Sequence, residues 1–187
     1  MDARIVTTKK FLKEALLNLL LEQPLSKISV KTLCAHAEIN RATFYSHYKD
    51  VPSLFDEIIS EFISEIGKYV NRINDDLSVI DRKKSFVDLI KFVDRQSSLF
   101  VLIFENSSNI ENYTEQYQNL RLKIKMKISD EYDKNIYANY ITDYFFYAGG
   151  SLLYTWISNG KKETPEQLAK LMFALLTQGY SHFNKTK

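Results

Sequence analysis

Cysteine, glycine and proline are scarce in this sequence, and their scarcity narrows the class of fold. Only one of the 187 residues is a cysteine, so no disulfide can form within the chain, and the cytoplasm is the expected compartment. There are five glycines and three prolines, and Pro24, Pro52 and Pro165 stand where helices are expected to begin or end. No segment alternates apolar and polar residues for long, as a half-buried strand would. The sequence therefore predicts an all-α protein.

Long uncharged apolar runs and an N-terminal signal-peptide pattern are also missing, so we expect neither a membrane span nor export. There is no glycine-rich phosphate loop, Cys/His cluster or paired His–carboxylate motif, which argues against an enzyme. Cys34 and His36 are two residues apart, on different faces of a helix, and cannot converge on a metal. We predict no catalytic residue, cofactor or metal site. Cys34 is expected to be a buried small residue, with a redox switch as the minor alternative.

Residues 28–55, ISVKTLCAHAEINRATFYSHYKDVPSLF, contain two short helical patterns around a tight turn, followed by the start of a longer one. Ser29 and Asn40 stand where the two short helices begin, and both are residue types that cap helix N-termini. A short helix with exposed N-terminal residues fits the major groove of DNA and can read base edges there. The stretch therefore predicts a helix-turn-helix.

This stretch resembles the DNA-binding region of TetR-type transcriptional regulators, whose pattern is roughly T-[VI]-x-x-[IL]-A-x-x-A-G-[VI]-S-x-G-T-[LF]-Y-x-H-[FY]-K-x-K-x-x-L. The positions that match in register are Ser29, Val30, Leu33, Ala37, Ile39, Thr43, Phe44, Tyr45, His47, Tyr48, Lys49 and Leu54. The resemblance implies a homodimer that binds a pseudo-palindromic operator and responds to a small molecule.

Two departures from the pattern bear on the local structure. Glu38 occupies the position of the turn glycine, and a left-handed conformation there would cost about 1–2 kcal/mol. Val51 and Pro52 replace the lysine that usually starts the next helix, which removes one candidate phosphate contact. Pro52 nevertheless suits a first helical turn, because its missing N–H would be unpaired there.

The resemblance also assigns roles to individual residues. Thr43, Tyr45, His47 and Lys49 match positions that contact the DNA backbone, and each side chain can donate a hydrogen bond to a phosphate oxygen. Arg41 can pair with guanine and the methyl of Ala42 can meet thymine, although a phosphate contact by Arg41 is an equal alternative. The predicted DNA-binding residues are Lys31, Asn40, Arg41, Ala42, Thr43, Tyr45, His47 and Lys49. Phe44 and Tyr48, aromatic residues four apart beside Ile39, are expected to pack in the core of the head.

The distribution of charge agrees with this assignment. Residues 1–49 contain eight Lys/Arg and four acidic residues, a net charge of +4, although the whole chain is only +2. The remaining residues are therefore net negative, and the basic end coincides with the helix-turn-helix. This is the electrostatic pattern expected of a module that binds phosphates.

Helical periodicity divides the chain into a three-helix DNA-binding head, residues 1–50, and a larger helical effector-binding and dimerisation domain, residues 51–187. The first helix is expected from Thr7 or Thr8, as cap, to about Glu22, with an apolar stripe that includes Phe11. A long helix over about 51–72 connects the two domains, and residues 71–78 are expected to form a polar connection. Further helical patterns cover 79–95, 99–104, 113–129, 136–158 and 165–183, which makes about nine helices in all.

The last two helices are the predicted dimer interface. Residues 137–158 are apolar or aromatic on nearly every face, and such a helix must be buried on all sides. Gly149 and Gly150 would let another backbone approach, and two such helices from each subunit form a four-helix interface with C2 symmetry. This region is similar to a TetR-type subgroup that includes activators of dihydroxyacetone kinase operons; an ordinary glycine-containing core helix is the alternative. The predicted interface residues are Gly149, Gly150, Leu153, Trp156, Leu168, Met172 and Leu175.

Aromatic residues are abundant between the head and these helices, and they could line a pocket for an apolar effector. The alternative is that they form the core and fill any pocket themselves. The predicted effector-binding residues are Phe104, Tyr117, Tyr140 and Tyr144. The sequence thus predicts a bacterial, cytoplasmic, homodimeric repressor controlled by an unidentified small molecule; the alternative is an accessory or architectural DNA-binding protein, or an activator, without an effector.

Overall fold

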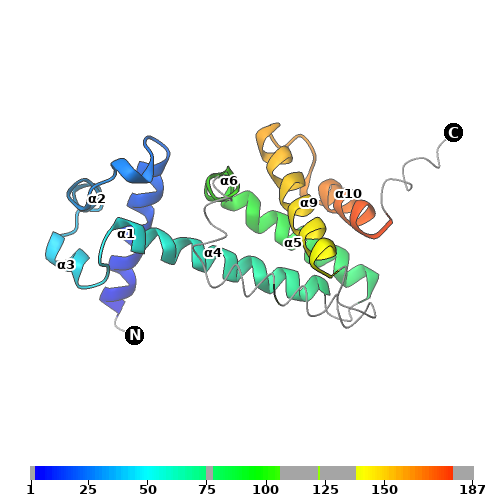
Figure 1. Ribbon diagram of the computed structural model, residues 1–187, viewed down its shortest axis with the longest axis horizontal. Coiled ribbons are helices and arrows are strands. Elements are labelled where there is room, and N and C mark those ends of the chain that lie inside the picture. Colours follow the sequence, from blue (N-terminus) through cyan, green and yellow to red (C-terminus); the bar gives the residue numbers. More distant parts are fainter. Residues whose placement is uncertain (1–2, 75–77, 106–121, 123–137, 179–187) are drawn as a thin grey trace. The chain divides into compact units, whose positions relative to one another are not determined.

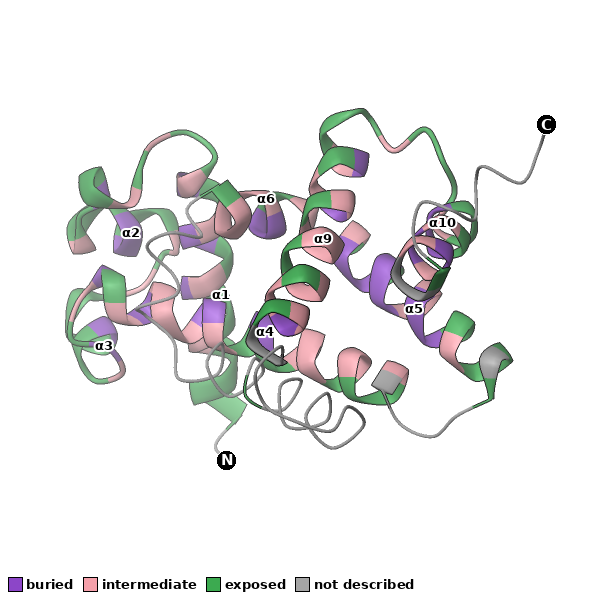
Figure 2. Ribbon diagram, turned by 45° about the vertical axis from the view of Figure 1, so that its right-hand side comes forward, coloured by how far each residue is buried: buried purple, intermediate pink, exposed green. Residues whose placement is uncertain are grey.

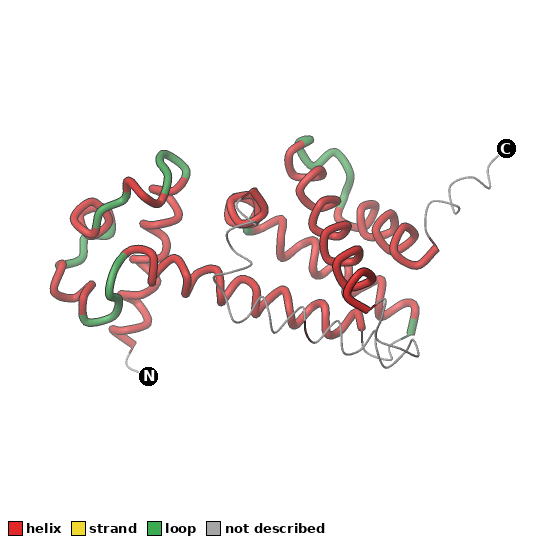
Figure 3. Tube along the Cα trace, in the orientation of Figure 1, coloured by secondary structure: helices red, strands yellow, loops and turns green. Residues whose placement is uncertain are grey.

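The computed structural model describes residues 3–74, 78–105, 122 and 138–178. Every regular element in these ranges is a helix (Figure 3), and no strand occurs among the described residues, so the predicted all-α class is confirmed. The predicted helix over 113–129 and the last residues of the one over 165–183 lie outside the described residues. The chain forms two compact units, residues 1–62 (unit 1) and 63–187 (unit 2), which meet within the long connecting helix.

The helices follow one another along the chain with one short 3₁₀ turn between them (Figure 1). Their bounds are α1 (Ala3–Leu20), η1 (Leu25–Lys27), α2 (Val30–His36), α3 (Arg41–Tyr45), α4 (Val51–Asn74), α5 (Val79–Arg95), α6 (Ser97–Glu105), α9 (Ala138–Ser158) and α10 (Pro165–Gln178). The long connecting helix is present as α4. It continues to Asn74, so the start of the expected polar connection is helical.

In unit 1, α1 packs against α2, and α2 packs against α3. Leu12 and Leu16 of α1 and Leu33 of α2 have no exposed surface. The cap predicted at Thr7 or Thr8 was wrong: α1 already begins at Ala3, and Thr7 Oγ1 donates back to the Ala3 carbonyl at 2.9 Å, inside the helix. Phe11, placed in the apolar stripe from its spacing, is exposed, because the buried face of α1 is narrower than the stripe.

Unit 2 is built on α5, whose inward face packs mainly against α10 and also meets α6 and α9. Figure 2 shows the buried face of α5 turned toward α10. Ile90 and Val93 are fully buried there, and Phe86 meets Phe173 edge to face, with ring centroids 6.1 Å apart. Ser78 caps α5, since its hydroxyl accepts a hydrogen bond from the Asp81 N–H.

Candidate nucleic-acid interface

Both short helices of the helix-turn-helix begin at the predicted caps. The hydroxyl of Ser29 accepts a hydrogen bond from the Thr32 N–H at 3.0 Å, and Oδ1 of Asn40 accepts one from the Ala42 N–H at 2.8 Å. Each bond satisfies an N–H that has no partner within its own helix. The caps therefore fix where α2 and α3 start, and they place Arg41 at the first position of α3.

The turn between α2 and α3 contains a left-handed residue that is not glycine. Glu38 has a φ of 55°, as expected from the glycine that the pattern has there. The Ile39 N–H donates to the Cys34 carbonyl at 2.9 Å, and the Glu38 N–H donates to the Ala35 carbonyl at 3.4 Å. This pair of bonds is a Schellman motif, in which the left-handed position strongly favours glycine. The turn thus keeps its geometry in spite of backbone strain at Glu38.

Helix α3 turns one residue inward and the others outward. Phe44 is fully buried, whereas Arg41, Ala42 and Thr43 are exposed, and Tyr45 is 51% exposed with its ring edge-on to Phe44 at 5.5 Å. The expectation that Phe44 belongs to the core is confirmed. A helix held by a single buried anchor leaves most of its surface for a partner.

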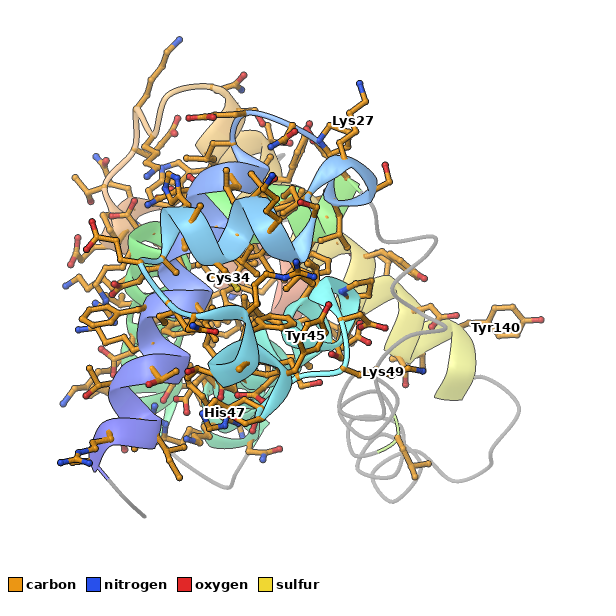
Figure 4. All side chains as sticks on the ribbon, turned by 90° about the vertical axis from the view of Figure 1, so that its left-hand side faces the viewer. Lys27, Cys34, Tyr45, His47, Lys49 and Tyr140 are labelled. Carbon is orange, nitrogen blue, oxygen red and sulfur yellow. The ribbon has the colours of Figure 1, made fainter. Side chains whose placement is uncertain are left out.

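The remaining predicted DNA-binding residues share this exposed character. Lys31, Asn40 and Lys49 are exposed, and His47 is half-buried, with its ring centroid 6.4 Å from that of Tyr48. Figure 4 views unit 1 with Tyr45, His47 and Lys49 labelled, and all three lie on α3 or on the segment that follows it. The structure thus leaves every predicted DNA-binding side chain at least partly accessible, on α2, α3 or the segments beside α3.

Lys49 is followed directly by the cap of α4. Oδ1 of Asp50 accepts a hydrogen bond from the Ser53 N–H at 2.8 Å, and the Ser53 hydroxyl accepts one from the Asp50 N–H at 3.2 Å. These reciprocal bonds form a capping box, which satisfies two orphan donors at once. Pro52 takes the second position of the helix, where no intrahelical bond requires its N–H.

A group of charged residues that the sequence did not point to joins α1 to α4. Glu57 and Glu61 of α4 face Lys9 and Lys13 of α1: Lys13 Nζ lies 2.7 Å from Glu57 Oε1 and 2.6 Å from Glu61 Oε1. Burial acts to raise the pKa of Glu57, but hydrogen bonds from Lys13 and Lys9 outweigh it and the pKa is lowered. For Lys13, burial acts to lower the pKa, but bonds to the two glutamates raise it. No local spacing could have revealed this group, because its members are 48 residues apart.

Cys34 is buried, as expected of a small residue inside the helix-turn-helix. Burial raises the pKa of its thiol, and the nearby charge of Arg41 opposes this only in part. A raised pKa keeps the sulfur protonated and unreactive at neutral pH, which disfavours the redox alternative.

Four of the predicted interface residues lie inside unit 2. Leu153, Trp156, Leu168 and Met172 are each at most 5% exposed, because α9 and α10 pack against each other and against α5. Trp156 also donates from Nε1 to the Glu163 carbonyl at 2.8 Å. These side chains hold α9 and α10 together from within the protomer, so a partner subunit cannot reach them directly. Leu175, Gly149 and Gly150 are half-buried.

The exposed surface of α9 is a different face of that helix. Tyr140, Tyr144 and Tyr147 are 73%, 56% and 43% exposed. Ser151 and Thr155 continue the same line and are also exposed. The spacings of three or four residues place all five on one side of the helix. One side of this apolar helix is therefore largely exposed in the single chain, whereas the expected burial on all sides includes a partner subunit.

The described members of the predicted effector-binding set lie in different environments. Phe104 of α6 is half-buried and stacks on Tyr154 of α9 and on Phe100, with ring centroids 4.8 and 5.9 Å away. Tyr140 and Tyr144 belong to the exposed face of α9, and Tyr117 lies outside the described residues. Phe104 is therefore the one predicted member with an inward aromatic environment among the described residues.

Metal centres and membrane spans are both absent from the described residues. No group of three or more His, Cys, Asp or Glu side chains is placed to hold a metal ion there. None of the described helices combines the length and the apolar character needed to cross a membrane.

A helix-turn-helix whose second helix is largely exposed, followed by a second unit whose described elements are all helices, is the architecture of a helix-turn-helix transcriptional regulator. A family model described as "Transcriptional regulator C-terminal region" (TetR_C_8) matches residues 81–178, which is more than half of the chain. The chain belongs to the TetR-type family of transcriptional regulators. Members of this family regulate transcription and are not enzymes, and so the expectation of a regulator rather than an enzyme is confirmed.

Individual relatives agree with this assignment. The HTH-type transcriptional regulator YxbF of Bacillus subtilis (strain 168) is 21% identical over 170 residues, which cover 89% of this chain and 44% of YxbF. This chain thus spans less than half the length of that relative. The fatty acid degradation regulator FadR of Bacillus halodurans has a similar fold, with a TM-score of 0.72 and 14% identity over 92% of this chain and 96% of FadR.

Two further solved structures share the fold. FadR of Bacillus subtilis, determined in complex with stearoyl-CoA, has a TM-score of 0.68 and 14% identity, with 91% and 98% of the two chains covered. The dihydroxyacetone kinase operon activator DhaS has a TM-score of 0.56 and 22% identity, with 90% and 93% covered. At these identities the likeness concerns the fold alone.

Proposed function

We propose that this protein binds a pseudo-palindromic DNA operator as a cytoplasmic homodimer and represses transcription, with its DNA affinity controlled by a small molecule. The observation that carries the proposal is the surface of α3, where Arg41, Ala42, Thr43 and Tyr45 are exposed around the single buried anchor Phe44. Exposed residues at the start of a recognition helix read base edges, and we assign this role to Arg41 and Ala42. Thr43, Tyr45, His47 and Lys49 supply the phosphate contacts. Lys31 on α2 and Asn40 at the cap of α3 complete the proposed DNA-binding surface.

The exposed face of α9, made of Tyr140, Tyr144, Tyr147, Ser151 and Thr155, supports the homodimer. Tyrosines are enriched at interfaces, and the three tyrosines of this face are largely exposed in the single chain. If two copies of this face meet around a two-fold axis, α9 becomes buried on all sides, as its sequence requires. We therefore propose this face for the interface, with the buried α9–α10 residues supporting it from behind.

Control by an effector is supported by the aromatic contacts between α6 and α9. Phe104 and Tyr154 stack there, and the hydroxyl of Tyr154 donates to Glu105 at 2.9 Å. An apolar ligand that separated these rings would bind one arrangement of the unit better than another, and differential binding is what shifts an equilibrium. The stearoyl-CoA complex of Bacillus subtilis FadR is one case in which a protein of similar fold holds a ligand with a long apolar chain.

The alternative, a DNA-binding accessory protein or an activator without an effector, is favoured by one observation. Phe104 is already packed by Phe100 and Tyr154, so the protein's own side chains fill this part of the unit. Two measurements distinguish effector control from its absence. They are the melting temperature and the DNA affinity, each measured with acyl-CoA thioesters and other apolar metabolites present. A compound that shifts both supports effector control, whereas a protein that binds one operator and responds to none supports the alternative.

The function itself is tested by selecting bound duplexes from a random library and measuring binding to the selected sequence at several salt concentrations. An inverted repeat, bound orders of magnitude more tightly than random DNA, is the expected result. Absence of enrichment, with weak and steeply salt-dependent binding, would leave only attraction to phosphates and would overturn the proposal.

A further inference from the structure

Glu57, early in α4, is the meeting point of three other side chains of unit 1. Its carboxylate accepts hydrogen bonds from Lys9 Nζ at 3.0 Å and from the hydroxyl of Tyr48 at 3.2 Å, and it pairs with Lys13 Nζ at 2.7 Å. Lys9 Nζ also lies 5.2 Å from the centroid of the Tyr48 ring. One carboxylate therefore connects α1, α4 and the segment that follows α3.

Tyr48 extends this connection to the recognition helix. The tyrosine is only 5% exposed, and its ring centroid lies 5.7 Å from that of Phe44. Its N–H also donates to the Phe44 carbonyl at 2.9 Å. Since Phe44 is the one buried side chain of the five-residue helix α3, that helix has little packing of its own to set its rotation. A neighbour that fixes Tyr48 therefore restricts the orientation of α3.

We propose that Glu57 is a positioning residue for DNA recognition, which holds Tyr48 against α1 and α4 and so sets the orientation in which α3 presents Arg41 and its neighbours to the bases. The inference rests on the proposed operator binding, and it assigns part of the specificity to a residue outside the DNA-contacting surface. Glu57 and its lysines are partly buried, with 18–33% of each side chain exposed, so these ion pairs are screened less than exposed ones.

The distinction between specific and non-specific binding makes the role measurable. Non-specific affinity depends on the number of cations that meet phosphates, and it tolerates small rotations of α3. Base readout depends on the position of each side chain, so a loosened α3 loses affinity for the operator but not for random DNA. A residue that merely stabilised the fold would change the melting temperature and leave the ratio of the two affinities unchanged.

The experiment compares the full-length protein with Glu57→Ala, Glu61→Ala and Tyr48→Phe. Glu61→Ala is the matched control, because it removes the same charge and also a partner of Lys13, but Glu61 is not bonded to Tyr48 or Lys9 in the contacts above. Tyr48→Phe keeps the buried ring and deletes only the hydroxyl that reaches Glu57. For each protein, affinity is measured for the selected operator and for a random duplex of equal length at one salt concentration, together with the melting temperature.

We expect Glu57→Ala to lower the ratio of operator to random affinity by about fivefold or more, the loss that corresponds to one ordinary hydrogen bond. Tyr48→Phe should lower the ratio as well. Glu61→Ala should leave the ratio within about twofold of the wild-type value, a smaller change than the loss of one such hydrogen bond produces. A wild-type ratio in Glu57→Ala would overturn the inference alone. If Glu57→Ala does not fold, Tyr48→Phe decides, and a wild-type ratio there overturns it. A ratio near one in the unmodified protein would instead overturn the proposed function, and the inference with it.

Discussion

Gly150 of α9 lies against the ring of Phe104 of α6, and a Cβ added at Gly150 would stand 3.0 Å from Phe104 Cε2. The adjacent Gly149 has more room, since a Cβ there would meet Met172 Cε at 4.0 Å, an ordinary contact distance. The two glycines therefore differ in what they do. Gly150 lets α6 approach α9 within one chain. This contact accounts for the glycine, which from the sequence alone was expected to let a partner's backbone approach.

Alanine substitutions at the two glycines are expected to have opposite effects on stability. Gly150→Ala gains helix propensity but overpacks the Phe104 ring, and we expect a net loss of about 1 kcal/mol. Gly149→Ala gains the same propensity without a clash and should stabilise the protein by up to about 1 kcal/mol. Thermal melting followed by circular dichroism measures both, and each variant serves as the control for the other.

The same pair tests whether a partner subunit approaches α9 at Gly149. If Gly149→Ala lowers the melting temperature and also weakens self-association, the partner's backbone lies closer than the protomer alone indicates. The expected result is an unchanged dimer dissociation constant for Gly149→Ala, because the proposed interface lies on the tyrosine face of α9. Sedimentation of both variants across a range of concentrations would separate the two cases.

The strained turn of the helix-turn-helix gives a second prediction. Replacing Glu38 with glycine relieves the positive φ, and we expect the free energy of unfolding to rise by about 1 kcal/mol. Glu38→Ala is the control, because it removes the same negative charge but keeps a side chain in the left-handed conformation. Chemical denaturation should show a higher midpoint for the glycine variant only. Equal midpoints for the two variants would mean that charge, and not backbone strain, is what matters at this position.

The local parts of this fold could be predicted from the sequence. Caps at Ser29 and Asn40, the left-handed Glu38 and the buried Phe44 and Tyr48 all depend on interactions within a few residues, and the structure confirms each of them. The helices α4 and α5 were predicted with nearly the bounds observed, because long apolar periodicity is a strong signal. Such features need no knowledge of how distant segments meet.

Relations between distant segments could not be predicted in this way. Glu57 pairs with Lys9 across 48 residues of sequence, and no local pattern around either residue indicates the pair. An apolar residue of α9 can face the core of its own chain or a partner. Hydrophobicity alone does not predict that Leu153 is buried in the chain whereas Tyr144 is exposed. The α6–α9 packing decides that question, because it buries one side of α9 and leaves the other side exposed.

The residues that we propose contact DNA should divide into two classes by their effect on specificity. Lys49→Ala removes a cation that the proposal places next to phosphates, so it should weaken binding to every duplex alike and reduce the slope of log affinity against log salt by about 1. Arg41→Ala should instead change the preference at one position of each half-site, by about 1–3 kcal/mol, if the arginine reads a base. Binding of both variants to a set of single-base operator variants distinguishes the roles. Identical profiles would show that Arg41 contacts phosphate.

The exposed face of α9 predicts how the proposed dimer can be broken without unfolding the subunit. Tyr144→Glu places a charge in the centre of this face, and we expect at least about a tenfold weaker dimer, since a buried unpaired charge is costly. Ile80→Glu, at an apolar position on α5 that is even more exposed than Tyr144, is the control and should leave association unchanged. Sedimentation equilibrium measures the association, and circular dichroism checks that the helices remain. A Tyr144→Glu protein that stays fully dimeric would place the interface elsewhere.

The ion pairs of Glu57 also predict how stability depends on pH. Burial opposes ionisation of this carboxyl, but the bonds from Lys13 and Lys9 prevail, so its pKa in the folded state lies below the ordinary value of 4.5. A carboxyl with a lowered pKa contributes stability that is fully present above its unfolded pKa and is lost as the pH falls through its folded pKa. The wild-type protein should therefore lose unfolding free energy more steeply below about pH 4.5 than Glu57→Gln, which has no proton to gain there.

Glu14→Gln, at an exposed position 3.8 Å from Lys10, is the control and should follow the wild-type curve. Urea denaturation at a series of pH values measures the curves, and parallel curves for wild type and Glu57→Gln would mean that the bonds to Lys9 and Lys13 add nothing to stability.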